Sequence, residues 1–224
     1  FYSSAITSLT ISDSVELIGY RAFGATSIET LVIPESTKFN DSTGNYGVRS
    51  AIPSICSSLV TLVIGQKNVR DFSGCGNLET VTLLDSVETI EGSAFEDANS
   101  LTAIELPDSL TTIGSEAFSG SGILSIEIPD SVTSIGNEAF KNTSLTSVKL
   151  PSNLTTVRNG LFQGVTGVTE IVLPDTITDI GSSAFRDMNL AGLVLPSSLR
   201  NIGPEEFYSS AITSLTISDS VELI

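Results

Sequence analysis

Apolar residues recur along the chain at fixed offsets within a period near 22 residues. The unit LTAIELPDSLTTIGSEAFSGSG (101–122) is followed by ILSIEIPDSVTSIGNEAFKNTS and then by LTSVKLPSNLTTVRNGLFQGVTG. In the first unit, Ile104 and Leu106 lie two residues apart, which predicts the inward face of a short strand. The segment PDS predicts a turn, LTTI a second extended piece and SEAF a helical turn. We therefore expect each unit to form one coil with its apolar side chains inside.

One such coil cannot be stable alone. Burying about seven apolar side chains contributes roughly 1.5 to 3 kcal/mol each, whereas ordering the residues of a unit costs about 1.5 kcal/mol per residue. Stacked coils bury a shared core and pair their strands with both neighbours. The sequence thus predicts an α/β repeat solenoid of about nine to ten coils, with short parallel strands, short helical turns and two open ends. The units open at Ile6, Ile28, Leu59, Leu78, Leu101, Ile123, Leu145, Val168, Leu190 and Ile212.

The pattern L-x-x-L-x-L-P-D-S-L-T-x-I-G-x-x-A-F resembles the BspA-like leucine-rich repeats over nearly the whole chain. The resemblance is specific because P-D-S, I-G and A-F recur together. It implies a surface protein of certain bacteria or protists that adheres to host proteins and to other cells. The position usually held by Asn mostly carries hydroxyl residues here, which we expect to bond the turn backbone: Ser14, Ser86, Ser109, Ser131, Asn153, Thr176 and Ser198.

A longer period overlies the short one. Residues 1–18, FYSSAITSLTISDSVELI, recur unchanged as residues 207–224, a shift of 206 residues. Exposed positions match as well as core positions, which neighbouring units do not show. Either residues 1–224 are one block of a longer tandem array, or the identity reflects how the segment was delimited. Both ends fall inside a coil, so we expect the single solenoid to continue beyond them or to stack end to end.

Charge and residue types narrow the function. With 26 Asp and Glu against 10 Lys and Arg, the net charge of −16 would repel nucleic acids and anionic membranes. No apolar run reaches membrane-spanning length. The chain has no His and only two Cys, so His-dependent catalytic triads and the usual zinc, haem and copper ligand sets cannot be assembled. We expect no catalytic residue, no cofactor, no nucleic-acid partner and no membrane insertion.

The units opening at Ile28 and Leu59 are irregular, at 31 and 19 residues, and contain an insertion at about 34–58. This insertion is either a tolerated surface loop or a contact loop, because loops on rigid scaffolds often carry recognition. It brings a relatively basic patch to an acidic rod, which could dock on the acidic flank of a neighbouring rod. The patch comprises Lys38, Arg49, Lys67 and Arg70.

The outward strand positions lie four residues after each unit start. In related solenoids this face binds partners. Here it lacks an aromatic anchor, so recognition and simple solubility both stay open. The face comprises Thr10, Val32, Val63, Thr82, Glu105, Glu127, Lys149, Val172 and Val194.

Three N-x-S/T sequons could carry glycans, which matters only in a secreted eukaryotic protein. The sequons lie at Asn40, Asn142 and Asn153, and Asn40 in the insertion is the best candidate. Asn153 occupies the hydroxyl position and is expected to face inward, where a glycan would not fit. Chance occurrence is the alternative.

Cys56 and Cys75 each lie three residues before the next unit start, Leu59 and Leu78. Equivalent places on adjacent coils are about 4.8 Å apart, close enough for a disulfide. We predict this disulfide, which would indicate an oxidising compartment. Two buried free thiols are the alternative.

Acidic residues stack between two adjacent coils. From 71 to 140 the chain has thirteen Asp and Glu and no Lys or Arg, and Glu116 shares its offset with Glu138. Opposed carboxylates at about 5 Å repel each other. Salt screening, splayed side chains or capping of the PDS turn would relieve this, and so would weak calcium binding. The calcium hypothesis places the ion among Asp108, Asp130, Glu105 and Glu127.

These observations favour a non-enzymatic, extracellular or cell-surface repeat protein with a structural or adhesive role, forming part of a tandem array or fibre. Its partners would be further copies of itself, end to end or side by side. The alternative is a receptor module that binds a host or matrix protein or a glycan through the strand face or the insertion.

Overall fold

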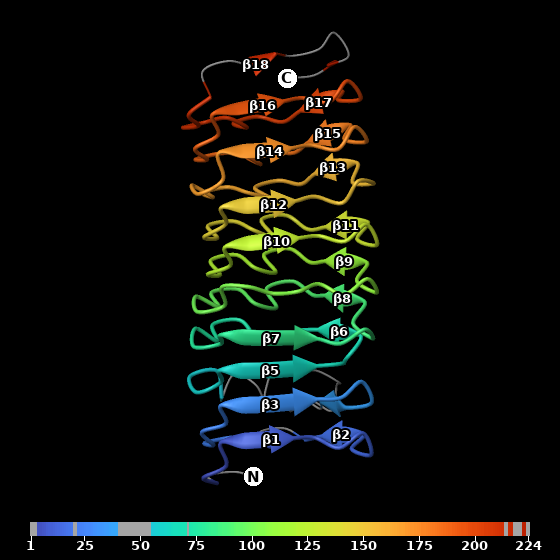
Figure 1. Ribbon diagram of the computed structural model, residues 1–224, viewed down its shortest axis with the longest axis vertical. Coiled ribbons are helices and arrows are strands. Elements are labelled where there is room, and N and C mark those ends of the chain that lie inside the picture. The colour runs from blue at the N-terminus through green and yellow to red at the C-terminus, as the bar shows by residue number, and fades with distance from the viewer. Residues whose placement is uncertain are drawn as a thin grey trace.

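The predicted units stack into a rod of coils, with the two ends of the chain at opposite ends of the rod (Figure 1). The structure is a computed structural model, and it describes residues 4–19, 22–39, 55–70, 72–212, 215–216 and 221–222. Most coils place one strand in a front column, at left in Figure 1, and a two-residue strand in a back column, at right. The leucine-rich-repeat solenoid is therefore confirmed.

The front column contains the longer strands, which pair in parallel with strands of neighbouring coils. Their side chains alternate, so that Leu31 is buried while Val32 beside it points outward. Period-two alternation is what a strand with one buried face requires. The front strands are β1 (Ser8–Thr10), β3 (Thr30–Ile33), β5 (Thr61–Ile64), β7 (Thr80–Leu83), β10 (Ser125–Glu127), β12 (Ser147–Lys149), β14 (Glu170–Val172), β16 (Gly192–Val194) and β18 (Leu215–Thr216).

The back column contains strands of two residues each, in which the second residue is apolar. Where the structure describes both side chains, the second one is buried and belongs to the core. These strands are β2 (Leu17–Ile18), β4 (Lys38–Phe39), β6 (Asn68–Val69), β8 (Thr89–Ile90), β9 (Thr112–Ile113), β11 (Ser134–Ile135), β13 (Thr156–Val157), β15 (Asp179–Ile180) and β17 (Asn201–Ile202).

A continuous stack of phenylalanine rings lines the core along the third side of each coil. Neighbouring rings lie nearly parallel, with centroids 5.6 Å apart for Phe95 and Phe118 and 6.3 Å apart for Phe162 and Phe185. Offset or stacked ring pairs at such distances add about 0.5 to 1.5 kcal/mol beyond burial. The phenylalanine position of the repeat therefore supplies one ring to each coil from Phe72 to Phe207.

The A-F segments do not form helical turns, so that part of the fold prediction is wrong: the described residues contain no helix. The amide of Phe95 donates to the carbonyl of Ala117 in the next coil at 2.8 Å. Ser93 and Asp97, two residues before and two residues after Phe95, have φ values of 55° and 57°. These left-handed residues turn alternate amides toward the neighbouring coil, which takes them out of any helical hydrogen-bond pattern.

The hydroxyl position forms a ladder between coils. The side-chain hydroxyl of Ser109 donates to the carbonyl of Val87 at 2.6 Å, and that of Thr176 donates to Leu154 at 2.7 Å. The predicted bond to turn backbone is thus confirmed, and its acceptor belongs to the preceding coil. Ser131 differs, because its hydroxyl oxygen is buried and has no hydrogen-bond partner among the described residues.

The predicted disulfide joins Cys56 to Cys75, whose Cα atoms lie 4.2 Å apart. It links two successive coils at equivalent places, as their sequence offsets require. Both cysteines are buried in the core. Much of the insertion, including Asn40 and Arg49, lies outside the described residues.

Candidate interaction surface

The predicted strand face forms one outward column on the front of the rod. Register pairing aligns Thr10 with Val32 and Val32 with Val63, and farther along it aligns Glu127 with Lys149. Most members of the column are exposed, whereas Val32 and Val63 are half-buried. Seven of the nine predicted positions are therefore exposed in the structure.

An apolar strip occupies the C-terminal half of this face. Val172 and Val194 are each 84% exposed and lie opposite each other on the paired strands β14 and β16. An open concavity of about 470 Å³ is lined by both valines and by the backbone of these strands. Solubility does not explain two neighbouring valines that expose most of their surface, because exposed apolar area is unfavourable in water. Such a strip is typical of a surface that contacts a partner.

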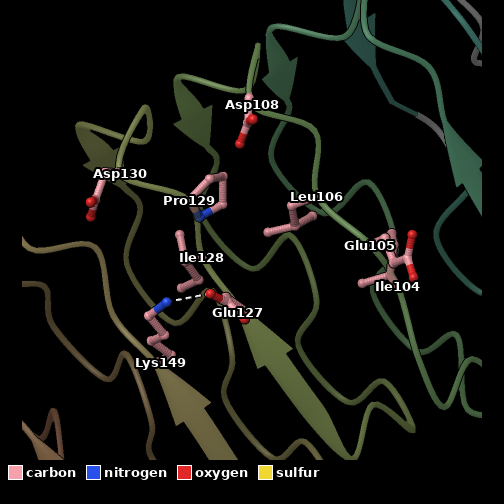
Figure 2. A pocket seen from close by; sticks show the side chains of 9 residues that line it. All are labelled: Ile104, Glu105, Leu106, Asp108, Glu127, Ile128, Pro129, Asp130 and Lys149. Carbon is pink, nitrogen blue, oxygen red and sulfur yellow. Dashed lines mark hydrogen bonds and ion pairs between the residues drawn. The ribbon is translucent and has the colours of Figure 1, made fainter.

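Within the described residues the front sheet is interrupted twice, between β7 and β10 and between β12 and β14. Glu105 forms only an isolated bridge to Thr82, and within the described residues no ladder joins it to β10. Continued pairing would set Glu105 directly opposite Glu127, and opposed like charges destabilise a sheet. An open concavity of about 590 Å³ lies at the interruption between β7 and β10 (Figure 2).

The charges around this concavity are partly neutralised by neighbouring coils. Lys149 forms an ion pair with Glu127, and the hydrogen bond between them raises the pKa of Lys149 (Figure 2). The amide of Ser152 donates to Asp130 at 2.7 Å, and this bond lowers the pKa of the Asp130 carboxyl. Screening by Lys149 and capping of a backbone amide are therefore the observed answers to carboxylate repulsion at these two residues.

The hypothetical calcium ligands all line this one concavity, yet they do not assemble a metal site. In the part of the chain that the structure describes, no group of three or more acidic or cysteine side chains is placed to hold an ion. Asp108 and Asp130 lie on successive turns, and Glu105 lies apart from the Glu127–Lys149 pair (Figure 2). Weak calcium binding has no ready coordination sphere here and stays a prediction.

The basic insertion patch is also partly neutralised. Lys67 forms an ion pair with Glu88 at 2.8 Å, and this hydrogen bond raises the pKa of Lys67. Arg70 lies 3.7 Å from Glu91 of the next coil. Lys38 lies on β4. Docking of this patch on another rod would compete with pairs inside the chain.

The two described sequons are both at the surface. Asn142 is exposed and has a φ of 54°. Asn153 is exposed too, so the expectation that it faces inward is wrong. Its side-chain amide donates to the carbonyl of Asp130 at 2.8 Å, which uses the nitrogen that a glycan would modify.

Sequence reasoning missed one buried carboxyl, Glu206. It occupies the alanine place of the A-F motif, in the segment GPEEF, and is only 3% exposed. One carboxyl oxygen accepts the amide of Ala184 at 3.0 Å, and burial raises the pKa of Glu206 to about 8. The replacement of alanine by glutamate at a repeated core position was the available signal.

The repeat geometry matches a known family. The model of the BspA type leucine rich repeat region matches six copies, over residues 1–48, 68–166 and 155–224. The chain belongs to the BspA-type leucine-rich repeat family. Comparison with curated protein sequences gives no match.

Solved structures share the BspA-type fold. A leucine-rich repeat protein from Bacteroides ovatus is 30% identical with a TM-score of 0.73, over 79% of this chain and 48% of that protein. The T. pallidum leucine rich repeat protein is 22% identical with a TM-score of 0.51, over 91% of this chain and 76% of that one. The pneumococcal vaccine antigen PcpA is 18% identical with a TM-score of 0.53, over 97% and 57%. This chain thus spans about half the length of the Bacteroides protein.

Among its described residues, no helix is suited to crossing a membrane.

Proposed function

We propose that this BspA-type chain is a non-enzymatic scaffold at the cell surface or outside the cell, with a structural or adhesive role. The observation that carries the proposal is the set of outward strand residues, which pairing holds in register within each of the three front sheets. Leucine-rich repeats generally serve protein interaction, and a rigid column of this kind presents side chains without an ordering cost at binding. The disulfide between Cys56 and Cys75 supports an oxidising compartment.

The second candidate is a receptor module that binds a protein or glycan, and the exposed Val172–Val194 strip favours it. A module of this kind would bind one partner per chain through the strip. A structural element would instead contact its partners through its ends or along its length. The two roles differ in valency, which a binding experiment can measure.

The test uses monomeric chain and a panel of purified extracellular proteins and glycans, with binding measured by biolayer interferometry. A receptor module gives saturable one-to-one binding that is lost when Val172→Lys and Val194→Lys are combined, because the charges replace the apolar strip. Ser134→Lys is the matched control, since Ser134 is exposed on the back strand β11. Binding that all variants retain excludes the strip, and absence of any binding across the panel contradicts the adhesive role.

A further inference from the structure

The exposed valines of the front face lie next to a carboxylate and to a place without a side chain. On the paired strands β14 and β16 (Figure 1), Val172 lies opposite Val194. Two residues before them on the same strands, Glu170 lies opposite Gly192. Residues two apart on a strand point to the same face of the sheet. These four residues therefore form one continuous surface, which we call the valine–glutamate patch.

Gly192 leaves a hollow in this patch. The equivalent place on other front strands carries an exposed side chain, as Thr80, Ser125 and Ser147 show. A β-carbon added at Gly192 would meet no atom within 4 Å. The open concavity of about 470 Å³ described above is lined by all four residues of the patch. Because it is open, it cannot enclose most of a small molecule as a ligand pocket does, but it can receive a side chain that protrudes from a macromolecule.

The Glu170 carboxylate gives the patch a negative charge that the chain does not neutralise. Glu170 is exposed and forms no ion pair in the part of the chain that the structure describes. The basic residue on the preceding coil, Lys149, already pairs with Glu127 on its other side. The same face also carries Glu105, and the whole chain has a net charge of −16. A second copy facing this patch would therefore place like charges together, so charge complementarity favours a cationic partner.

A cationic side chain of a protein fits both the charge and the apolar area. Lysine and arginine cover apolar surface with their methylene stems while the charged head stays in water or meets a carboxylate. An anionic glycan, nucleic acid or lipid surface would be repelled by Glu170 instead. Val172 and Val194 are each 84% exposed, which is more apolar area than one stem covers. An apolar side chain next to the cation would cover the remainder.

We propose that the valine–glutamate patch docks a protein segment in which a lysine or arginine lies next to an apolar residue. The cationic head pairs with Glu170, and its stem fills the hollow at Gly192. The apolar neighbour packs on Val172 and Val194. The inference rests on the proposed role in protein interaction and deepens it by naming the chemistry of the partner.

The test titrates a designed peptide against the full chain with isotope-labelled valine methyl groups, followed by methyl NMR. The probe is acetyl-Gly-Leu-Arg-Leu-Gly-amide at up to millimolar concentration. The methyl signals of Val172 and Val194 should shift and saturate. The matched peptide replaces arginine by citrulline, which has nearly the same shape and no charge. It should bind about two- to fivefold more weakly, the range expected for an exposed ion pair.

Three variants of the chain locate the contacts. Glu170→Gln should remove the difference between the arginine and citrulline peptides, because the charge that distinguishes them has lost its partner. Gly192→Thr should fill the hollow and largely remove the shifts, and the fold tolerates it because Thr80 occupies the equivalent place on β7. Glu105→Gln is the matched control, since Glu105 is an exposed carboxylate of the same face outside the patch. It should bind both peptides as the wild type does.

The proposal is overturned by equal affinity of the wild type for the two peptides, or by a difference that Glu170→Gln retains. Absence of any shift at the two valines with millimolar peptide also contradicts it. Shifts that appear on raising the concentration of the chain alone would assign the patch to a second copy and exclude a basic partner. The panel of extracellular proteins and glycans tests the proposed function separately, so a failed titration leaves that proposal standing.

Discussion

Glu206 should make the C-terminal coils less stable as the pH rises from about 4.5 to about 8. The carboxyl is 3% exposed, and its second oxygen has no hydrogen-bond partner among the described groups. Burial raises its pKa from 4.5 to about 8, so the folded state keeps a proton that the unfolded state has already released. At about 1.4 kcal/mol per pKa unit, the stability lost between pH 4.5 and about 8 is on the order of 5 kcal/mol.

The assay is hydrogen–deuterium exchange of peptides covering residues 183–212 between pH 5 and 8, because single coils of a repeat protein can open locally. Exchange rates are corrected for their intrinsic pH dependence, and Glu206→Gln, which cannot titrate, is the reference. The wild type should lose protection relative to this variant by up to about 1.4 kcal/mol per pH unit.

Other shifted groups act outside this window. The hydrogen bond from Thr178 and then that from Asn201 lower the pKa of Asp179, so its contribution is lost only as the pH falls below about 4. The raised pKa of Lys149, caused by its hydrogen bond to Glu127, matters only above about pH 10.

Parallel protection profiles for wild type and Glu206→Gln would refute the reasoning.

Four further outcomes are expected. Phe118→Ala should lower the unfolding free energy by about 3 to 5 kcal/mol in urea denaturation, because it interrupts the ring stack and leaves a cavity; a loss below 1 kcal/mol would contradict the stack's role. Glu116→Gly should raise the melting temperature, since the φ of 58° costs a non-glycine residue about 1 to 2 kcal/mol; no rise would show that the position is unstrained. Reducing the disulfide, whose cysteines are 19 residues apart, should cost about 3 kcal/mol, and two free thiols in the unreduced protein would contradict the bond. Millimolar Ca²⁺ should raise the melting temperature more than NaCl of equal ionic strength, and Asp108→Asn with Asp130→Asn should remove the difference; equal shifts would leave these carboxylates as a solubility surface.

The repeat period made the strands, their outward positions and the disulfide predictable, because all three depend only on which residues share an offset between coils. Cys56 and Cys75 share such an offset, and so do Glu127 and Lys149. Each pair lies on neighbouring coils in the structure. When coils stack, residues at the same offset in successive units become neighbours in space. Such neighbours can therefore be predicted from the repeat alone, without knowing the backbone conformation.

The prediction of a helical turn in the A-F segment was wrong because several of its residues have a left-handed backbone conformation. The letters SEAF suit a helical turn, yet residues such as Ser93, Glu116 and Glu138 adopt left-handed φ values that favour glycine. Inter-coil hydrogen bonds impose this conformation against local propensity. A single unit does not contain that information, since the acceptor carbonyls belong to the next coil.

The interruption at Glu105 was also hidden from pattern reasoning. The sequence places Glu105 opposite Glu127 and predicts repulsion there, which salt screening, splayed side chains, capping of the PDS turn or calcium would relieve. In the structure the strand ladder itself is lost, and Glu127 pairs with Lys149 on its other side. The repulsion between opposed carboxylates can be relieved in several ways that differ little in free energy. The positions of residues in the repeat do not show which of these ways the structure adopts.

Surface exposure on living cells tests the central claim most directly. Lys67 and Lys149 have side chains that are 59% and 71% exposed in the folded chain. A membrane-impermeant amine-reactive biotin applied to intact cells that produce the protein should label both lysines, as read by mass spectrometry of captured peptides. Labelling that appears only after the cells are lysed would contradict a scaffold at the cell surface.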